Sequence, residues 1–273
     1  MAGKLCIVAG GGRLPKLLID ACRESGRDFF VLALKGQADR EIVEQVPHDW
    51  IRMGAAGRGF AILKEQGVEE LVMAGRVRRP SLLDLRPDMR VMKFFARLGR
   101  KGIGDDGLLR AVVDEVENEG YRVIGAHDIL PKLTATEGTL GSIVPDDQAR
   151  ADIKRGIAVL TALSDVDIGQ AVVVQQGIVL GVEAVEGTDA LIERCRALKR
   201  DGPGGVLVKF SKRGQETRVD MATIGPETIR RAAAAGLRGI AMGAGSTIIL
   251  DVDQLVRAAD AAGIFVIGVA EEK

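Results

Sequence analysis

The stretch KLCIVAGGGRLPKLLIDAC, residues 4–22, sets the expected fold of the first half of the chain. Apolar residues lead to three consecutive glycines, and an amphipathic segment with Pro15 near its start follows. A strand, a glycine turn and a helix in this order are typical of parallel α/β sheets, where the turn brings backbone N–H groups to the end of the strand. We therefore expect a buried strand, a helix over 14–26, and a phosphate or a carbonyl on the amides of Gly11 and Gly12.

The ligand of this turn stays open on sequence grounds. A dinucleotide-binding turn reads G-x-G-x-x-G and has an acidic residue ~20 positions further on. Gly10 and Gly12 fit, but Pro15 occupies the third glycine position, and the next strand ends in LALKG without an acidic residue. The pattern fits a dinucleotide poorly, and a phosphate site and a purely structural turn remain equally compatible with it.

The composition excludes several classes of protein. The chain has 273 residues and 47% hydrophobic content, and its 38 Lys and Arg balance 38 Asp and Glu, so nothing favours nucleic acid as a partner. Three cysteines without C-x-x-C spacing fit a reducing compartment and argue against structural zinc. The N-terminus does not resemble a signal peptide, and no apolar run approaches the ~20 residues of a membrane span. We expect a soluble, cytoplasmic protein, and peripheral contact with the inner membrane stays open.

Apolar runs and amphipathic segments alternate through the first half and predict an α/β fold. Because strands that alternate with helices form parallel sheets covered on both faces, we expect an N-terminal Rossmann-like domain at 1–131. Its further strands are predicted at 29–34, 49–53, 69–75 and 121–130, and its further helices at 59–67, 91–99 and 105–120.

The second half predicts a mixed α/β domain. Residues 132–150 lack periodicity and are interpreted as a linker before a C-terminal domain at 151–273. Two apolar runs meeting at Gln176-Gly177 predict an antiparallel hairpin over 170–185. Further helices are predicted at 149–164, 188–200, 226–236 and 252–263, with strands at 205–211 and 264–269 and a strand pair within 239–251.

Two stretches of the first domain carry candidates for substrate contact. MAGRVRRP ends a strand with Gly75 and Arg76, and an arginine at the carboxyl end of a parallel strand suits a phosphate. A solvated loop explains the same residues equally well. KGIGDDGLLR adds four more candidates, with helix capping as the alternative role for the two acids: Lys101, Gly102, Asp105 and Asp106.

VEAVEGTDA, residues 182–190, combines two strand-end acids with a helix start. Glu183 and Glu186 have the oxygen ligands that a divalent metal prefers. Thr188 and Asp189 begin the following helix, where capping alone is the competing explanation. We select Glu186 as a metal ligand and the Thr-Asp pair as substrate contacts.

VKFSKRGQETRVDMATIG, residues 208–225, is the densest polar run after an apolar strand. QETRVD alternates like an edge strand, which would place Glu216, Arg218 and Asp220 on one face. Carboxylates beside cations are able to bind Mg²⁺ while the cations bind phosphates; a solvated edge strand is an equally open explanation. The candidates for substrate contact here are Lys209, Gln215, Arg218 and Thr223.

Missing motifs narrow the chemistry. His48 and His127 are the only histidines, so a dinuclear site built from several histidines is not available. The sequence also lacks a G-x-S-x-G elbow and a Walker A motif. Hydrolysis would therefore rely on carboxylates, a hard cation and basic side chains.

Several motifs in their order resemble one known family. IVAGGGRLP, AGRVRRP, GDDGLLR, GAHDIL, DIGQAVVV, GIVLGVEAVEGTDA and QETRVDMATIGPETI are similar to the UDP-2,3-diacylglucosamine pyrophosphatases of lipid A biosynthesis that are not metallophosphoesterases. The resemblance runs from about residue 4 to about residue 270. Two departures are visible: Arg76 stands where the family pattern has Asn, and the loop KGIGDD is longer than the usual KGDD.

The resemblance implies a Mg²⁺-dependent hydrolase with two α/β domains. It would split the pyrophosphate of UDP-2,3-diacylglucosamine into UMP and 2,3-diacylglucosamine 1-phosphate. The family's catalytic acid falls on Asp220, which we expect to bind Mg²⁺ together with Glu186 and Glu216, or to orient water. The amphipathic UDP-lipid would need an apolar surface, for which VMKFFARL offers Met92, Phe94, Phe95 and Leu98, although core packing explains at least half of these. A homo-oligomer stays open.

Two other functions remain as alternatives. A nucleotide-cofactor oxidoreductase is suggested by the first glycine turn alone, and bound nicotinamide or flavin would support it. A noncatalytic nucleotide-sugar sensor predicts binding of UDP-sugar without turnover.

Overall fold

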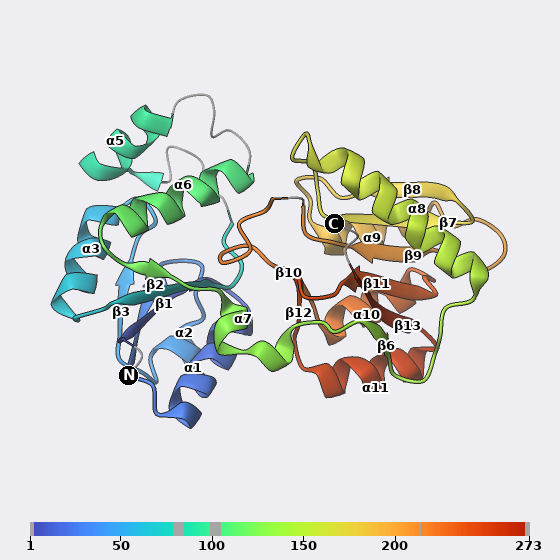
Figure 1. Cartoon of the computed structure of the whole chain (residues 1–273), viewed down its shortest axis with the longest axis horizontal. Coiled ribbons are helices and arrows are strands. Elements are labelled where there is room, and N and C mark those ends of the chain that lie inside the picture. Colours follow the sequence, from blue (N-terminus) through green and yellow to red (C-terminus); the bar gives the residue numbers. More distant parts are fainter. Residues whose placement is uncertain (1–2, 79–84, 99–104, 213, 271–273) are drawn as a thin grey trace. The chain divides into compact units, whose positions relative to one another are not determined.

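The computed structural model describes residues 3–78, 85–98, 105–212 and 214–270, which divide into two compact units (Figure 1). Unit 1 comprises Met1–Pro131 together with the short segment Arg218–Asp220. Unit 2 comprises Lys132–Thr217 and Met221–Lys273. The residue predicted to be catalytic therefore belongs to unit 1, although the chain on both sides of its segment belongs to unit 2.

Unit 1 contains a five-stranded parallel sheet in the order β3-β2-β1-β4-β5. The central strand pairs Leu5 with Phe29 on one side and with Glu70 on the other. The predicted parallel α/β fold of the first half is confirmed. The strands are β1 (Leu5–Ala9), β2 (Phe29–Leu34), β3 (His48–Ile51), β4 (Glu70–Ala74) and β5 (Arg122–Val123).

Helices cover the sheet of unit 1 with their apolar faces. Ile62 of α3 and Val113 of α6 join Cys6, Phe30 and other strand residues in one buried cluster. Helix α1 buries Leu18, Ile19 and Cys22 and ends at Gly26, whose φ of 68° suits a left-handed cap. The helices are α1 (Leu14–Ser25), α2 (Arg40–Val43), α3 (Ala56–Glu65), α5 (Met89–Leu98), α6 (Asp105–Asn118), α7 (Ala126–Ile129) and the 3-10 turn η2 (Pro131–Leu133).

The strand predicted over 121–130 is wrong in its second half. Only Arg122–Val123 pairs with the sheet, and helix α7 begins directly afterwards. Asp128 accepts a hydrogen bond of 2.9 Å from the backbone N–H of Gly125, which starts the helix. This local cap outweighs the apolar alternation of the stretch.

Unit 2 contains a six-stranded mixed sheet in the order β6-β13-β11-β9-β7-β8. Strands β13, β11 and β9 run parallel, whereas β6, β7 and β8 pair antiparallel with their neighbours. The predicted mixed α/β domain is confirmed. The strands are β6 (Gly138–Leu140), β7 (Ala171–Gln175), β8 (Ile178–Val182), β9 (Val206–Lys209), β11 (Gly239–Gly243) and β13 (Phe265–Val269), and a separate parallel pair joins β10 (Ala222–Ile224) to β12 (Thr247–Ile249).

Alternate residues of these strands enter two different cores. Val172 and Val174 of β7 pack with α8, whereas Val173 packs with the residues of α9, α10 and α11. Because successive side chains of a strand point to opposite faces, the run of valines serves both layers. The helices are α8 (Asp147–Ser164), α9 (Thr188–Arg196), α10 (Pro226–Ala234) and α11 (Val252–Ala262), and α8 lies along the sheet in Figure 1.

The predicted hairpin is confirmed, and its turn is held by a buried acid. Gln176 and Gly177 have φ values of 53° and 78°, as a tight hairpin turn requires. Asp152 of α8 is 1% exposed and accepts the backbone N–H groups of both residues, at 3.0 and 2.6 Å. This carboxylate has a structural role.

Two further expectations differ from the structure. The stretch 132–150, interpreted as a linker, belongs to unit 2 and contains β6 and the first residues of α8. The strand pair predicted within 239–251 is wrong, because β12 leaves the main sheet after the turn at Gly245 and pairs with β10. Both differences arise from pairings between distant parts of the sequence.

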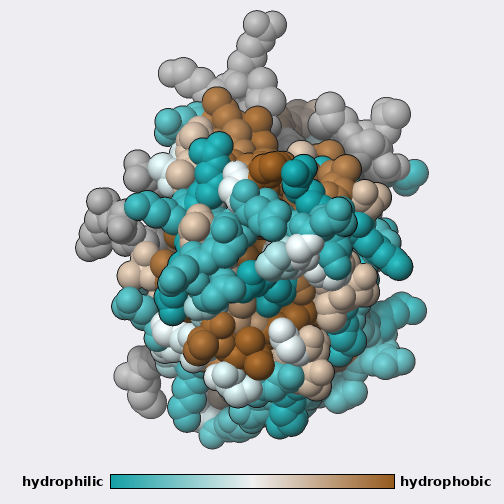
Figure 2. Space-filling model, turned by 90° about the vertical axis from the view of Figure 1, so that its right-hand side faces the viewer, coloured by the Kyte–Doolittle hydropathy of each residue, from teal (hydrophilic) through white to brown (hydrophobic). Residues whose placement is uncertain are grey.

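The surface is largely hydrophilic on the side shown in Figure 2, where hydrophobic residues gather in small separate patches. Among the helices that the structure describes, none is long and apolar enough to cross a membrane.

Candidate functional site

The glycine turn after β1 lies against the turn after β4. The N–H of Gly11 donates to the carbonyl of Arg76, and the N–H of Arg76 donates to the carbonyl of Gly11, each over 2.8 Å. Gly75 has a φ of 96°, and a Cβ on it would lie 2.6 Å from the Gly11 oxygen. A Cβ on Gly10 would lie 2.6 Å from the Arg76 oxygen. These glycines therefore permit a close backbone approach that other residues would block.

This geometry answers part of the question that the turn raises. The amide of Gly11 is bonded to a carbonyl of the chain itself, so a phosphate would have to displace this bond. Gly12 has a φ of 93°, and the Nε of Arg76 lies 3.9 Å from the position that a Cβ on Gly12 would occupy. The structure thus brings together four predicted substrate contacts: Gly11, Gly12, Gly75 and Arg76. Their role toward a substrate stays a prediction.

Unit 2 contains a buried polar chain formed by Glu183, Thr188 and Lys209. The ammonium of Lys209 donates to the hydroxyl of Thr188, and this hydroxyl donates to Glu183, each over 2.8 Å. Glu183 also accepts the N–H of Gln170 at 3.2 Å. Lys209 and Glu183 are each 6% exposed. A charged group is rarely buried to this extent without partners, and these contacts supply them.

The surrounding elements explain why these side chains meet. Lys209 ends β9, Glu183 follows β8, and Thr188 is the first residue of α9. Carboxyl ends of parallel strands and helix N-termini are places where α/β proteins bind anions. The buried polar chain thus fixes one ammonium at such an edge, and two of the predicted contacts, Thr188 and Lys209, touch each other directly.

A second polar group follows β9 in unit 2. Lys212 pairs with Asp167 at 2.5 Å, and its backbone N–H donates to the side chain of Gln215 at 2.7 Å. Gln215 is 8% exposed, and its own N–H donates back to the carbonyl of Lys212. The hydroxyl of Ser211 donates to the carbonyl of Ser246. Gln215, a predicted contact, therefore shapes the loop after β9.

The edge strand predicted for QETRVD is wrong. The stretch forms no strand, and residues 217–219 make a turn. Arg218 pairs with Glu117 of α6 at 2.6 Å, and Val219 packs against the core of unit 1. Burial of the one apolar residue between two charged ones outweighs the alternation. Glu216 belongs to unit 2, whereas Arg218 and half-buried Asp220 belong to unit 1.

Glu186 is engaged by an arginine. Its carboxylate accepts two bonds from the guanidinium of Arg194, at 2.9 and 3.1 Å, and the N–H of Ala184. The pKa of Glu186 lies below its ordinary value, because its own backbone N–H donates to the carboxylate and Arg194 adds a further bond. Glu183, next to it in sequence, is the acid that enters the buried polar chain. The strand-end position of both acids was visible in the sequence, but burial was not.

The predicted metal ligands do not form a cluster within either unit. Among the described residues, no three Asp, Glu, His or Cys side chains come together in a way that would hold a metal ion. Mg²⁺ is commonly held by one or two carboxylates together with substrate phosphates. Asp220, Glu186 and Glu216 therefore stay predictions as ligands.

The remaining predicted contacts have local partners or lie outside the described residues. Asp106 pairs with Arg110 one helical turn away at 2.7 Å, and Asp189 lies 3.7 Å from Arg231. The hydroxyl of Thr223 donates to the carbonyl of Met221. Asp105 begins α6. Lys101 and Gly102 fall outside the described residues.

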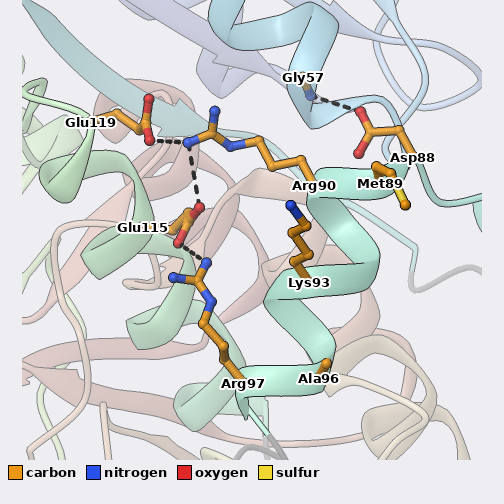
Figure 3. Close-up of a pocket in the computed structure, with 9 residues that line it drawn as sticks. All are labelled: Gly57, Asp88, Met89, Arg90, Lys93, Ala96, Arg97, Glu115 and Glu119. Carbon is orange, nitrogen blue, oxygen red and sulfur yellow. Dashed lines mark hydrogen bonds and ion pairs between the residues drawn. The ribbon is translucent and has the colours of Figure 1, made fainter.

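The largest cavity described lies in unit 1, beside α5 and α6. It has a volume of about 880 Å³ and is lined mainly by charged residues. Arg90 pairs with Glu115 and Glu119, and Arg97 pairs with Glu115 (Figure 3). Within the described part of the chain, none of the predicted site residues lines this cavity.

The cysteines are not candidates for nucleophiles. Cys6, Cys22 and Cys195 are free and buried, and burial raises the pKa of Cys6 to about 12. A thiol with so high a pKa stays protonated and unreactive. The expected lack of disulfides among the described residues fits a reducing compartment.

The fold and these two regions define an α/β protein with basic side chains at the carboxyl ends of its strands, a setting suited to an anionic ligand. Residues 4–133 match the LpxI N-terminal domain, and residues 136–267 match the LpxI C-terminal domain. The chain belongs to the LpxI family. The UDP-2,3-diacylglucosamine pyrophosphatase LpxI of Caulobacter vibrioides is 42% identical over 275 residues, which cover 97% of each chain. The predicted family is confirmed, and with it the prediction of an enzyme of this class.

Solved structures show only a distant likeness. An N5-carboxyaminoimidazole synthase from Aspergillus clavatus is 11% identical with a TM-score of 0.26, and a complex of carboxyaminoimidazole ribonucleotide synthase with ATP is 12% identical with a TM-score of 0.24. The matches cover 72% of this chain but only 44% and 45% of those chains. These values are too low to support an argument about this protein.

Proposed function

We propose that this chain hydrolyses the pyrophosphate bond of UDP-2,3-diacylglucosamine and releases UMP and 2,3-diacylglucosamine 1-phosphate. The observation that carries the proposal is the near full-length identity of 42% to a relative named for this pyrophosphatase. In the reaction, the oxygen of water bonds to one phosphorus while a bridging P–O bond breaks.

We assign the catalytic role to Asp220. Its carboxylate would orient the attacking water and accept a proton from it. The turn at residues 217–219, anchored by Arg218 on Glu117 and by Val219 in the core, fixes the backbone before this acid. A carboxylate held by a packed turn keeps its position as charge develops.

The buried polar chain would receive the charge of the diphosphate. Lys209 is held by Thr188, and its ammonium has three protons, of which one goes to that hydroxyl. Because a cation in a site with little water interacts strongly with an anion, this arrangement favours binding of a phosphate group. Arg76, beside Gly12, is the corresponding candidate in unit 1.

Magnesium dependence is part of the proposal. When bound, Mg²⁺ would neutralise diphosphate charge. The described residues of either unit offer no group of three ligands, so we assign no coordination sphere beyond the predicted carboxylates. Single carboxylates together with the phosphates of the substrate are compatible with this ion.

The test is an assay of purified protein with UDP-2,3-diacylglucosamine, in Mg²⁺ or in EDTA, with products identified by mass spectrometry. We expect UMP and 2,3-diacylglucosamine 1-phosphate in Mg²⁺ only. Asp220→Ala should lower turnover by about 100-fold or more while the substrate still binds. Asp201→Ala, which changes an exposed acid in a bend of unit 2, is the matched control and should keep wild-type turnover.

Three results would contradict parts of the proposal. Binding of the substrate without turnover would favour a nucleotide-sugar sensor. Near-normal turnover of Asp220→Ala would remove this residue from the mechanism. Turnover in EDTA equal to that in Mg²⁺ would remove the metal.

A further inference from the structure

Helix α5 exposes an apolar stripe formed by Met89, Met92 and Phe95. These side chains are 67%, 48% and 36% exposed, whereas Val91 on the same helix is 8% exposed and faces the unit. Positions 89, 92 and 95 follow one another at a spacing of three residues, so they share one side of the helix. Phe94 and Leu98, considered above for acyl chains, are only half-buried on the other side. Single exposed apolar residues are common, but three along one ten-residue helix form a coherent surface.

The charged residues of α5 are all basic. Arg90, Lys93 and Arg97 are the charged side chains between Met89 and Leu98, and no acidic residue occurs there. Arg90 and Arg97 reach toward the acids of α6, while no ion pair within the described residues engages Lys93 (Figure 3). Arg97 nevertheless keeps a side-chain exposure of 65%. The exposed part of the helix thus combines apolar side chains with positive charge.

The cavity beside α5 argues against an acyl-chain site at this helix. Its walls contain Arg90, Lys93 and Arg97 on one side and Glu115 and Glu119 on the other. An acyl chain needs an apolar cavity, because it cannot satisfy buried charges. The apolar stripe itself is an exposed helix side, which suits a lipid surface better than a single chain.

A second copy of this chain is also a poorer partner. In a symmetric contact the same surface meets itself, so Lys93 would approach its counterpart. Like charges at such an interface are unfavourable. An anionic lipid surface, by contrast, attracts cations and accepts apolar side chains below its headgroups.

We propose that helix α5 docks unit 1 on a bilayer that contains anionic phospholipid. Met89, Met92 and Phe95 enter the boundary between headgroups and acyl chains, and Lys93 and Arg97 contact the headgroups. The biological use of this docking rests on the proposed function, since a diacylated substrate resides in a bilayer. The docking itself requires no substrate.

The test is flotation of the full-length protein with vesicles that contain no substrate. One set consists of phosphatidylcholine with one quarter phosphatidylglycerol, and the other of phosphatidylcholine alone. We expect wild-type protein to float with the anionic vesicles and less so with neutral vesicles or in raised salt. Met89→Ser/Met92→Ser/Phe95→Ser should weaken binding by about tenfold or more, and Lys93→Glu by several-fold.

A matched control separates this surface from general hydrophobicity. Ile178→Ser/Leu198→Ser changes two apolar side chains of unit 2 with exposures of 45% and 49%, and it should bind like wild type. An unchanged thermal midpoint of every variant shows that folding is intact. Failure of wild-type protein to float, or equal flotation of the triple variant, would overturn the proposal.

The two proposals fail separately. Hydrolysis of substrate dispersed in detergent without vesicle binding would refute the docking and leave the proposed function intact. Vesicle binding that depends on α5, without hydrolysis, would support the docking and refute the proposed function.

Discussion

The two units end their parallel strands in different ways. After β1 and β4 of unit 1, backbone meets backbone: Gly11 and Arg76 exchange two hydrogen bonds of 2.8 Å, and glycines leave room for the contact. After β8 and β9 of unit 2, side chains meet instead, because Lys209, Thr188 and Glu183 form the buried polar chain. The first arrangement depends on shape and the second on charge.

This difference changes what each sequence motif indicates. A glycine run at a strand end is typical of phosphate-binding turns, yet here the partner of the Gly11 amide is a carbonyl of the protein. A lysine at a strand end looks like an ordinary surface residue, yet Lys209 is 6% exposed. Burial of a charge has a cost in free energy that a close packing of glycines does not have, and function is one reason to retain it.

The largest effect that we expect concerns the buried charge. Lys209→Met would leave Glu183 without its link to a cation, so the free energy of unfolding should fall by about 3 kcal/mol. Turnover of UDP-2,3-diacylglucosamine should fall by about 100-fold, because a fixed cation near the diphosphate is lost. Chemical denaturation and a steady-state assay measure the two effects. Lys154→Met, at an exposed position of α8, is the matched control.

A double variant sharpens this prediction. Lys209→Met/Glu183→Gln removes both charges, and it should recover part of the stability but not the turnover. If the single variant kept wild-type turnover, the buried polar chain would be purely structural, and the contrast between the two units would lose its functional side.

A smaller effect is expected at the backbone contact of unit 1. Gly75→Ala places a Cβ 2.6 Å from the Gly11 oxygen at a φ of 96°, so strain and overlap add. The free energy of unfolding should fall by about 3 kcal/mol, measured by urea denaturation. Gly36→Ala is the matched control: its φ is 75° and nothing lies within 4 Å, so about 1 kcal/mol is expected. Equal losses in the two variants would show that the close approach contributes nothing.

The local parts of the fold could be predicted from the sequence. The runs around Leu5 and Phe29 and the turn at Gln176-Gly177 follow from apolar pattern and turn chemistry, which act within a few residues. The pairing of β12 with β10 could not, because it joins Ala222 to Thr247 across a helix and a strand of the main sheet. Tertiary context decides such pairings.

The candidate site divides in the same way. The sequence identified Lys209 and Thr188 by their positions at a strand end and a helix start, and the structure joins them. It selected Glu186 as the important acid of its motif, although Glu183 is the buried one, because alternation does not reveal which of two nearby acids faces inward after a strand has ended. It also predicted an edge strand for QETRVD, since the burial of Val219 in unit 1 depends on a core far away in sequence.

The smallest effect concerns an exposed charge of unit 2, and it tests whether burial is what distinguishes Lys209. Asp146 caps α8 by accepting the N–H of Ala149 at 2.8 Å and pairs with Arg238. The bond from Arg238, followed by that from the backbone of Ala149, lowers the pKa of Asp146 from its ordinary value of 3.8. Because the folded-state pKa is the lower one, the pair stabilises the protein above pH 3.8, and this stabilisation is lost as the pH falls through the folded-state pKa.

Asp146→Asn should keep the cap but lose the charge. Its thermal midpoint should lie slightly below that of wild type at neutral pH and in low salt, and the difference should shrink when the pH falls well below 3.8 or when salt is added. Thermal denaturation over a series of pH values checks this. The midpoint shift of Lys209→Met should persist in high salt, since salt screens buried charges much less than exposed ones. If salt reduced both shifts equally, exposure would not distinguish the two charges, and the contrast between shape and buried charge would have to be given up.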